Sequence, residues 1–135
     1  MSLAATVSVP SARAFDFDWK AVEQGVPLSA LDAFASYSGF AMKELLEVVI
    51  PIRTLKHRRQ RGEAISVVEA ERLARMARIY ELTLKVFGDP DKARRWLSRP
   101  KHRFDDRSPL SLMRSEPGGR SVEEALIQID EGMYI

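Results

Sequence analysis

The longest regular hydrophobic pattern in this chain runs from Val67 to Phe87. Apolar residues recur there at alternating spacings of three and four, which is the period of one face of an α-helix. They are Ala70, Leu73, Ala77, Tyr80 and Leu84, with Met76, Ile79, Leu82 and Val86 widening the stripe. Ser66 and Glu69 have the spacing of a capping box at its start. Because a helix this apolar must be wrapped by others, the pattern predicts a central hydrophobic spine.

Three shorter helices are predicted before the spine. The first begins at Ser29 and ends at Gly39, because glycine readily adopts the positive φ of a helix C-cap. A second covers residues 41–48, and the junction 49–51 leads into a third at residues 51–61. Their apolar positions are Leu31, Phe34, Ala35, Met42, Leu45 and Leu46. Two short helices joined by a tight turn, the second one cationic, form a helix-turn-helix pattern.

The third helix carries the positive charge of the chain. Residues 51–61 contain five Lys or Arg and no acidic residue, whereas residues 1–50 have a net charge of −3 and residues 62–135 a net charge of 0. Ile52 and Leu55 lie three apart and can face the core. The other side carries Arg53, Lys56, His57, Gln60 and Arg61. Such side chains suit phosphate oxygens and the major-groove edges of guanine and adenine.

We therefore predict a DNA-recognition helix that binds operator DNA. The candidates for the groove face are Arg53, Lys56, His57 and Arg61, and the candidates for phosphate are Thr54, Arg58 and Arg59. Helix-turn-helix proteins usually bind paired half-sites as dimers, so we also expect a homodimer. The alternative interpretation is a solvated basic face that has no nucleic-acid partner.

Beyond the spine, turn and cap residues divide the chain into further helices. Asp89-Pro90 begins one that stops at Arg99-Pro100, and Ser108-Pro109 begins a helix of one turn. Residues 116–119 are expected to form a turn, and a capping box at 121–124 to open a last helix that Gly132 ends. No strand pattern is found anywhere, so the predicted class is all-α.

The N-terminal segment differs in character. Residues 1–24 are expected to form a flexible arm, in which Phe15, Phe17 and Trp19 could make a short extended piece. That piece could dock on the body of the protein or on a second subunit. The predicted organisation is thus an arm (1–24), a helix-turn-helix unit (25–65) and a C-terminal helical unit (66–135).

Composition excludes several classes of function. The chain of 135 residues has no cysteine, which fits a reducing cytoplasm, and it shows neither a signal peptide nor an apolar run that could span a membrane. The two histidines, His57 and His102, have no metal-ligand spacing. There is also no P-loop or GxGxxG motif. We therefore expect no catalytic residues, no metal site, no cofactor and no small-molecule substrate.

The C-terminal half resembles a known family. Its features are Phe87-Gly88-Asp89-Pro90 with Ala93, Trp96-Leu97 and Pro100, then Pro109-Leu110, Val122, Leu126 and Gly132-Met133-Tyr134. Together with the basic helix, this order is similar to the Xre/MbcA/ParS antitoxins that are paired with RES-domain toxins. Asp105-Asp106 and the run 114–117 depart from the family pattern, which affects the expected toxin-facing surface.

The resemblance implies a protein with two roles. Family members bind a RES-domain toxin, which is thought to destroy NAD, and repress their own operon through the helix-turn-helix. On this basis the toxin-binding candidates are Arg99, Met133, Tyr134 and Ile135. Alternatively the tail folds back on the core and Arg99 is merely solvated, and Trp96 is expected to be a core anchor. Two rival functions remain, a stand-alone transcription regulator and an interaction adaptor that never contacts DNA.

Overall fold

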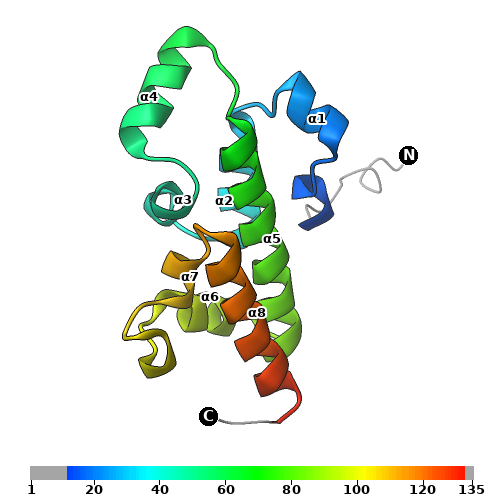
Figure 1. Cartoon of the computed structure of the whole chain (residues 1–135), viewed down its shortest axis with the longest axis vertical. Coiled ribbons are helices and arrows are strands. Elements are labelled where there is room, and N and C mark those ends of the chain that lie inside the picture. The colour runs from blue at the N-terminus through cyan, green and yellow to red at the C-terminus, as the bar shows by residue number, and fades with distance from the viewer. Residues whose placement is uncertain (1–11, 133–135) are drawn as a thin grey trace, which may run out of the picture.

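The computed structural model describes residues 12–132, in which helices are joined by short loops. This range contains no β-strand, only isolated bridges between Val26 and Ile65 and between Lys101 and Arg107. The elements in order are η2 (Ala12–Phe15), α1 (Trp19–Gln24), α2 (Ser29–Ser38), α3 (Met42–Val48), α4 (Ile52–Arg61), α5 (Val67–Phe87), α6 (Pro90–Ser98), η3 (His102–Phe104), α7 (Pro109–Leu112) and α8 (Glu116–Asp130) (Figure 1). The predicted all-α class is confirmed.

Helix α5 is the central element, with the bounds that its hydrophobic pattern predicts (Figure 1). It packs against η2, α1, α2 and α3 from the N-terminal half and against α6 and α8 from the C-terminal half. Leu73, Met76 and Ile79 are fully buried. The capping box is also present, because Ser66 Oγ accepts from the Glu69 N–H and Glu69 Oε1 accepts from the Ser66 N–H. Helix α5 therefore contributes residues to the hydrophobic core of both halves of the molecule.

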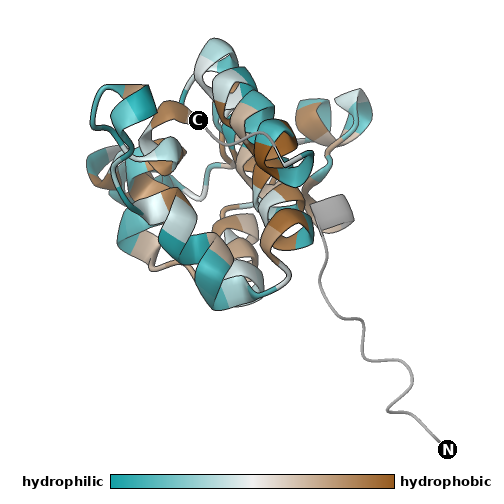
Figure 2. Cartoon of the chain, turned by 90° about the horizontal axis from the view of Figure 1, so that it is seen from below, coloured by the Kyte–Doolittle hydropathy of each residue, from teal (hydrophilic) through white to brown (hydrophobic). Residues whose placement is uncertain are grey.

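Hydrophobic and hydrophilic positions alternate around the helices when the molecule is seen from below (Figure 2). The buried apolar residues form one continuous core that reaches from Phe15 to Leu126. No helix within residues 12–132 has the length and hydropathy needed to cross a membrane. The same part of the chain holds no group of three His, Asp or Glu side chains placed to bind a metal ion.

The described N-terminal segment is largely helical, and residues 16–18 link its two helices. Residues 12–15 form η2, and Asp18 caps α1 by accepting from the Ala21 N–H at 2.8 Å. Phe15 is 3% exposed and lies edge-on to Phe34, with ring centroids 5.2 Å apart. The expectation of an extended piece at residues 14–19 is therefore wrong, whereas its docking on the body is confirmed for Phe15. Local capping at Asp18 favours the helix over an extended chain.

The last helix begins earlier than the sequence pattern indicates. Residues 116–119, predicted as a turn, form the first turn of α8, which is capped by Ser115 Oγ accepting from the Gly118 N–H. The capping box expected at 121–124 is thus wrong, because a stronger start lies upstream: Ser115 as N-cap with Pro117 in the first turn. Glycine is disfavoured inside a helix, but positions 118 and 119 require it, because close packing leaves no room for a side chain at either Gly118 or Gly119.

Polar contacts join the two halves of the molecule alongside α5. Arg94 of α6 donates to the carbonyl of Ser38 at the end of α2, at 2.8 Å, and it also pairs with Asp91. Ser98 Oγ donates to Glu44 Oε2 in α3 at 3.0 Å. Gly39 lies so close to Arg94 that a Cβ there would be 2.7 Å from its guanidinium. The C-terminal unit is therefore fixed to the end of α2.

Removing the Arg94 guanidinium should loosen this junction. We expect Arg94→Ala to lower the free energy of unfolding by about 1–2 kcal/mol, since the Ser38 carbonyl loses a charged donor. The measurement is urea unfolding followed by circular dichroism. Arg78→Ala is the matched control, because Arg78 is 54% exposed and its pair with Glu123 contributes little. Equal losses for the two variants would show that the junction is not stabilising.

Candidate functional site

Helix α4 is held in place by a small number of contacts. Pro51 precedes its first turn, Gly62 ends it with a φ of 67°, and Leu55 is buried to 1% exposure. Beyond Gly62, the Ile65 N–H donates to the Val26 carbonyl at 3.0 Å and returns the chain to the core. The helix projects from the body at the upper end of α5 (Figure 1). Helix α3, a tight turn and α4 have the arrangement of the predicted helix-turn-helix.

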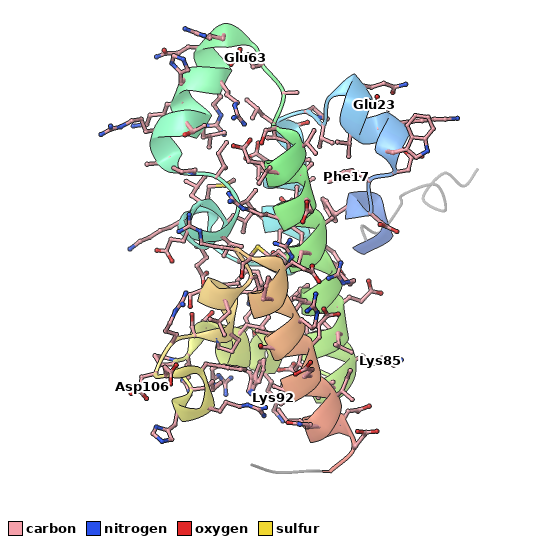
Figure 3. All side chains as sticks on the ribbon, in the orientation of Figure 1. Phe17, Glu23, Glu63, Lys85, Lys92 and Asp106 are labelled. Atoms are coloured by element: carbon pink, nitrogen blue, oxygen red, sulfur yellow. The ribbon has the colours of Figure 1, made fainter. Side chains whose placement is uncertain are left out.

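The outer face of α4 gathers the predicted groove residues. Five side chains line one open hollow there: Arg53, Thr54, Lys56, His57 and Gln60. Several side chains of α4 project away from the body of the molecule (Figure 3). Arg59 and Arg61 are also exposed. No acidic residue lines the hollow, so this surface is uniformly cationic and hydrogen-bonding.

Two predictions for α4 change on structural grounds. Ile52, expected to face the core, is 49% exposed, and Leu55 is the only residue of α4 that is buried. Arg58, expected to contact phosphate, forms an ion pair with Glu69 of α5 and is only 20% exposed. Glu69 is itself buried. Arg58 therefore connects α4 to the start of α5, and we leave it out of the proposed DNA-contacting set.

The predicted toxin-binding residues fall into two groups. Met133, Tyr134 and Ile135 lie outside the described residues. Arg99 is exposed and lines an open pocket of about 280 Å³ on α6. Trp96, expected as a core anchor, is half-buried against Phe87, with ring centroids 5.8 Å apart, and it lines the same pocket. Its ring therefore both packs on the core and forms part of the surface.

Sequence reasoning did not find Lys92 or Lys101, which also shape the α6 pocket. Lys92, Arg95 and Lys101 join Arg99 around the α6 pocket. Burial lowers the pKa of Lys101, and neighbouring Arg99 lowers it further. The spacing of Lys92, Arg95 and Arg99 at i, i+3 and i+7 was a signal for one shared helix face. For Lys101, which follows the helix, no local pattern exists.

Arg75 is a second residue that the sequence did not single out. It is 4% exposed and donates to the Met113 carbonyl at 2.9 Å and to Glu71 at 2.7 Å. It ties the α7–α8 connection to α5. Nothing in its position on the polar side of the helical stripe indicated burial, because the residues that cover it come from distant parts of the chain.

Comparison with known proteins assigns a family to each half of the chain. Residues 20–78 match the antitoxin Xre-like helix-turn-helix domain, and residues 84–132 match the antitoxin Xre/MbcA/ParS C-terminal toxin-binding domain. The first match covers α4 and its outer face, and the second covers every residue that lines the α6 pocket. The boundary between the matches falls within α5.

Individual relatives agree with these matches. The antitoxin Xre of Pseudomonas putida is 45% identical over 84 residues, which are 62% of this chain and 53% of that protein. This chain thus spans about half the length of that relative. The antitoxins Xre of Yersinia enterocolitica and Photorhabdus laumondii are 29% and 27% identical over 84% and 83% of this chain, and over 78% and 77% of their own lengths. With its helix-turn-helix domain followed by a toxin-binding domain, this all-helical chain belongs to the Xre/MbcA/ParS-type antitoxin family.

Proposed function

We propose that this protein is the antitoxin of a type II toxin–antitoxin system, that it blocks a RES-domain toxin that degrades NAD, and that it represses its own operon. The outer face of α4, cationic and free of acid, is the observation that carries the DNA-binding role. A match to a toxin-binding domain over residues 84–132 supports the second role. Neither role needs catalysis or a cofactor, and both suit a cytoplasmic protein.

The proposed DNA contacts follow from the geometry of α4. Arg53, Lys56, His57 and Arg61 would read base edges in the major groove, while Thr54 and Arg59 would contact phosphate. A homodimer would place two copies of α4 on half-sites one helical turn apart. Light scattering on the purified protein tests the dimer, and a footprint on its own upstream region tests the spacing of the half-sites.

Two substitutions in α4 separate base reading from phosphate contact. Arg53→Ala is expected to weaken operator binding by about 1–3 kcal/mol and to relax sequence preference, whereas Arg59→Ala should reduce the slope of log affinity against log salt by about one unit. Gel shifts on operator and scrambled duplexes at several salt concentrations measure both effects. Glu63→Ala, just beyond the helix, is the control. If neither variant differs from this control, α4 is not the recognition helix.

The second candidate function is a stand-alone transcription regulator that has no toxin partner. A pull-down from the native host at high salt distinguishes the two, because salt removes nucleic acid held by charge but leaves an apolar protein interface intact. Recovery of a stoichiometric RES-domain protein supports the antitoxin. Recovery of the dimer alone, from cells that express the neighbouring gene, supports the stand-alone regulator instead.

A further inference from the structure

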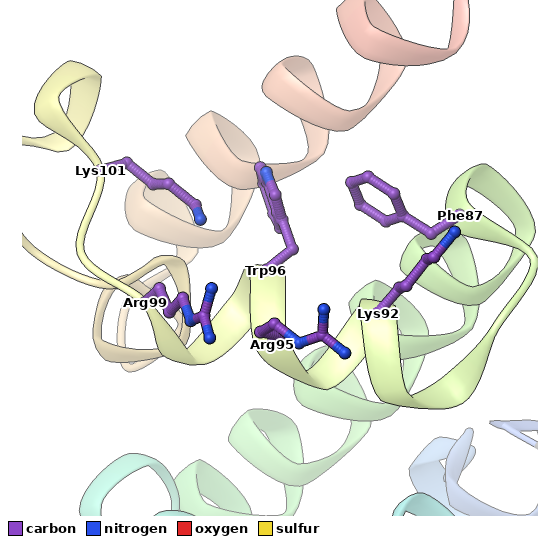
Figure 4. A pocket seen from close by; sticks show the side chains of 6 residues that line it. All are labelled: Phe87, Lys92, Arg95, Trp96, Arg99 and Lys101. Atoms are coloured by element: carbon purple, nitrogen blue, oxygen red, sulfur yellow. The ribbon is translucent and has the colours of Figure 1, made fainter.

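The pocket on α6 combines cations with aromatic rings. Lys92 and Arg95 come from α6, Arg99 is the C-cap residue of that helix, and Lys101 comes from the segment that follows it. Between them lie the rings of Trp96 and Phe87, which together form an apolar floor (Figure 4). The Nζ of Lys101 is 5.3 Å from the centroid of the Trp96 ring. An apolar surface is thus surrounded by four positive groups.

These four cations differ from four other cations of the C-terminal unit, which are paired within the chain. Arg75, Arg78, Arg94 and Arg120 each form an ion pair with a carboxylate of the described chain. Lys92, Arg95, Arg99 and Lys101 have no such pair with any described residue, and no acidic residue lines their pocket. Like charges that gather around a partly buried ring repel one another unless an anion binds between them.

The position of the pocket favours a protein partner over DNA. It lies wholly within the segment that matches a toxin-binding domain. Helix α4 precedes α5 and α6 follows it, and the two lie toward opposite ends of the molecule (Figure 1). Lys92 lies in the lower part, far from Glu63 beside the basic helix (Figure 3). The pocket and the outer face of α4 therefore lie on different parts of the molecule (Figure 1).

We infer that the α6 pocket binds a segment of the partner toxin that carries Asp or Glu, with the carboxylates on Lys92, Arg95 and Arg99 and an apolar side chain on the Trp96–Phe87 surface. This inference rests on the proposed function and identifies the chemistry of the toxin surface. Arg–carboxylate pairs provide geometric specificity, and the aromatic floor contributes buried apolar area. Lys101 is the fourth positive group around the pocket.

A charge-reversal pair tests the pocket in the full-length protein. Arg95→Glu with Arg99→Glu is expected to weaken binding of the co-purified toxin at least 30-fold, because like charges then face each other. The salt dependence of the remaining binding should also flatten. Lys85→Glu with Arg114→Glu is the matched control, since both residues are exposed in the same unit outside the pocket and the net charge changes equally. The control should stay within about threefold of the wild type.

Operator affinity and melting temperature are measured for the same variants. Equal toxin affinity for the two pairs would overturn the inference while leaving the proposed function intact, whereas a wild-type protein that binds no toxin would overturn the proposed function itself. Loss of operator affinity with unchanged toxin affinity would make the pocket a nucleic-acid contact. If the variant Arg95→Glu with Arg99→Glu has a lower melting temperature than the wild type, the variant Arg95→Gln with Arg99→Gln replaces it. Its toxin affinity is expected to be about tenfold below that of the wild type.

Discussion

Replacing Gly118 by alanine is expected to destabilise the protein by about 3 kcal/mol, although alanine is the better helix former by about 1 kcal/mol. Gly118 lies in the first turn of α8, where a Cβ would be 1.9 Å from the carbonyl oxygen of Leu112. That oxygen belongs to the backbone, so the clash is relieved only when α7 and α8 move apart. Such overpacking outweighs helix propensity.

The measurement is thermal and urea unfolding of Gly118→Ala beside Ser121→Ala. Ser121 is an exposed residue of the same helix, so its replacement should change stability by only a few tenths of a kcal/mol, in the stabilising direction. A loss of about 3 kcal/mol corresponds to a fall in Tm of roughly 10 °C for a chain of this size. If Gly118→Ala were as stable as the wild type, the start of α8 at Glu116 would be wrong.

Glu69→Ala is expected to have the second large effect, and to act on both stability and DNA binding. The side chain of Glu69 is 8% exposed, and its carboxylate accepts from the Ser66 N–H at 2.8 Å and pairs with Arg58 of α4. Its removal leaves a half-buried guanidinium unpaired and takes away half of the capping box. Breaking a fully buried pair costs about 3–5 kcal/mol; because Arg58 is partly solvated, we expect about 2–3 kcal/mol.

Operator affinity should fall at least tenfold in Glu69→Ala, because α4 loses its connection to α5, while toxin affinity stays unchanged. Calorimetry with each partner measures both quantities, and Glu81→Ala, an exposed acid of α5, is the control.

A double-mutant cycle with Arg58→Ala then identifies the role of Arg58. The double variant should be more stable than Glu69→Ala, since no charge is left unpaired. If Arg58→Ala instead lowers operator affinity without changing stability, Arg58 is a phosphate contact after all.

Local signals in the sequence were sufficient for most helices. The apolar period of residues 67–87 and its capping box predicted α5 with the observed bounds, because a long amphipathic pattern leaves few alternatives. Asp89-Pro90 and Ser108-Pro109 likewise predicted the starts of α6 and α7, since cap and first-position proline act within one turn. The signals failed at residues 116–119, where the glycines that indicated a turn are required by packing against Leu112 and Arg75.

The charge pattern predicted the site only in part. The spacing of Arg53, Lys56 and His57 on one face of α4 is visible in the sequence, and the structure brings them together around one hollow. Their roles toward DNA remain predictions. The same charge run could not show that Arg58 faces inward, because its partner Glu69 reaches it only after residues 62–66 turn the chain back.

The sequence by itself determined that the chain is helical, where the spine lies and where the positive charge is concentrated, since periodicity, caps and composition act over a few residues. Only the tertiary structure decided which charges remain available to a partner. Arg58 and Arg75 are turned inward to carboxylates and carbonyls, whereas Lys92, Arg95, Arg99 and Lys101 surround an aromatic floor. The physical reason is that burial and ion pairing depend on residues distant in sequence, which are brought together only when the helices pack around α5.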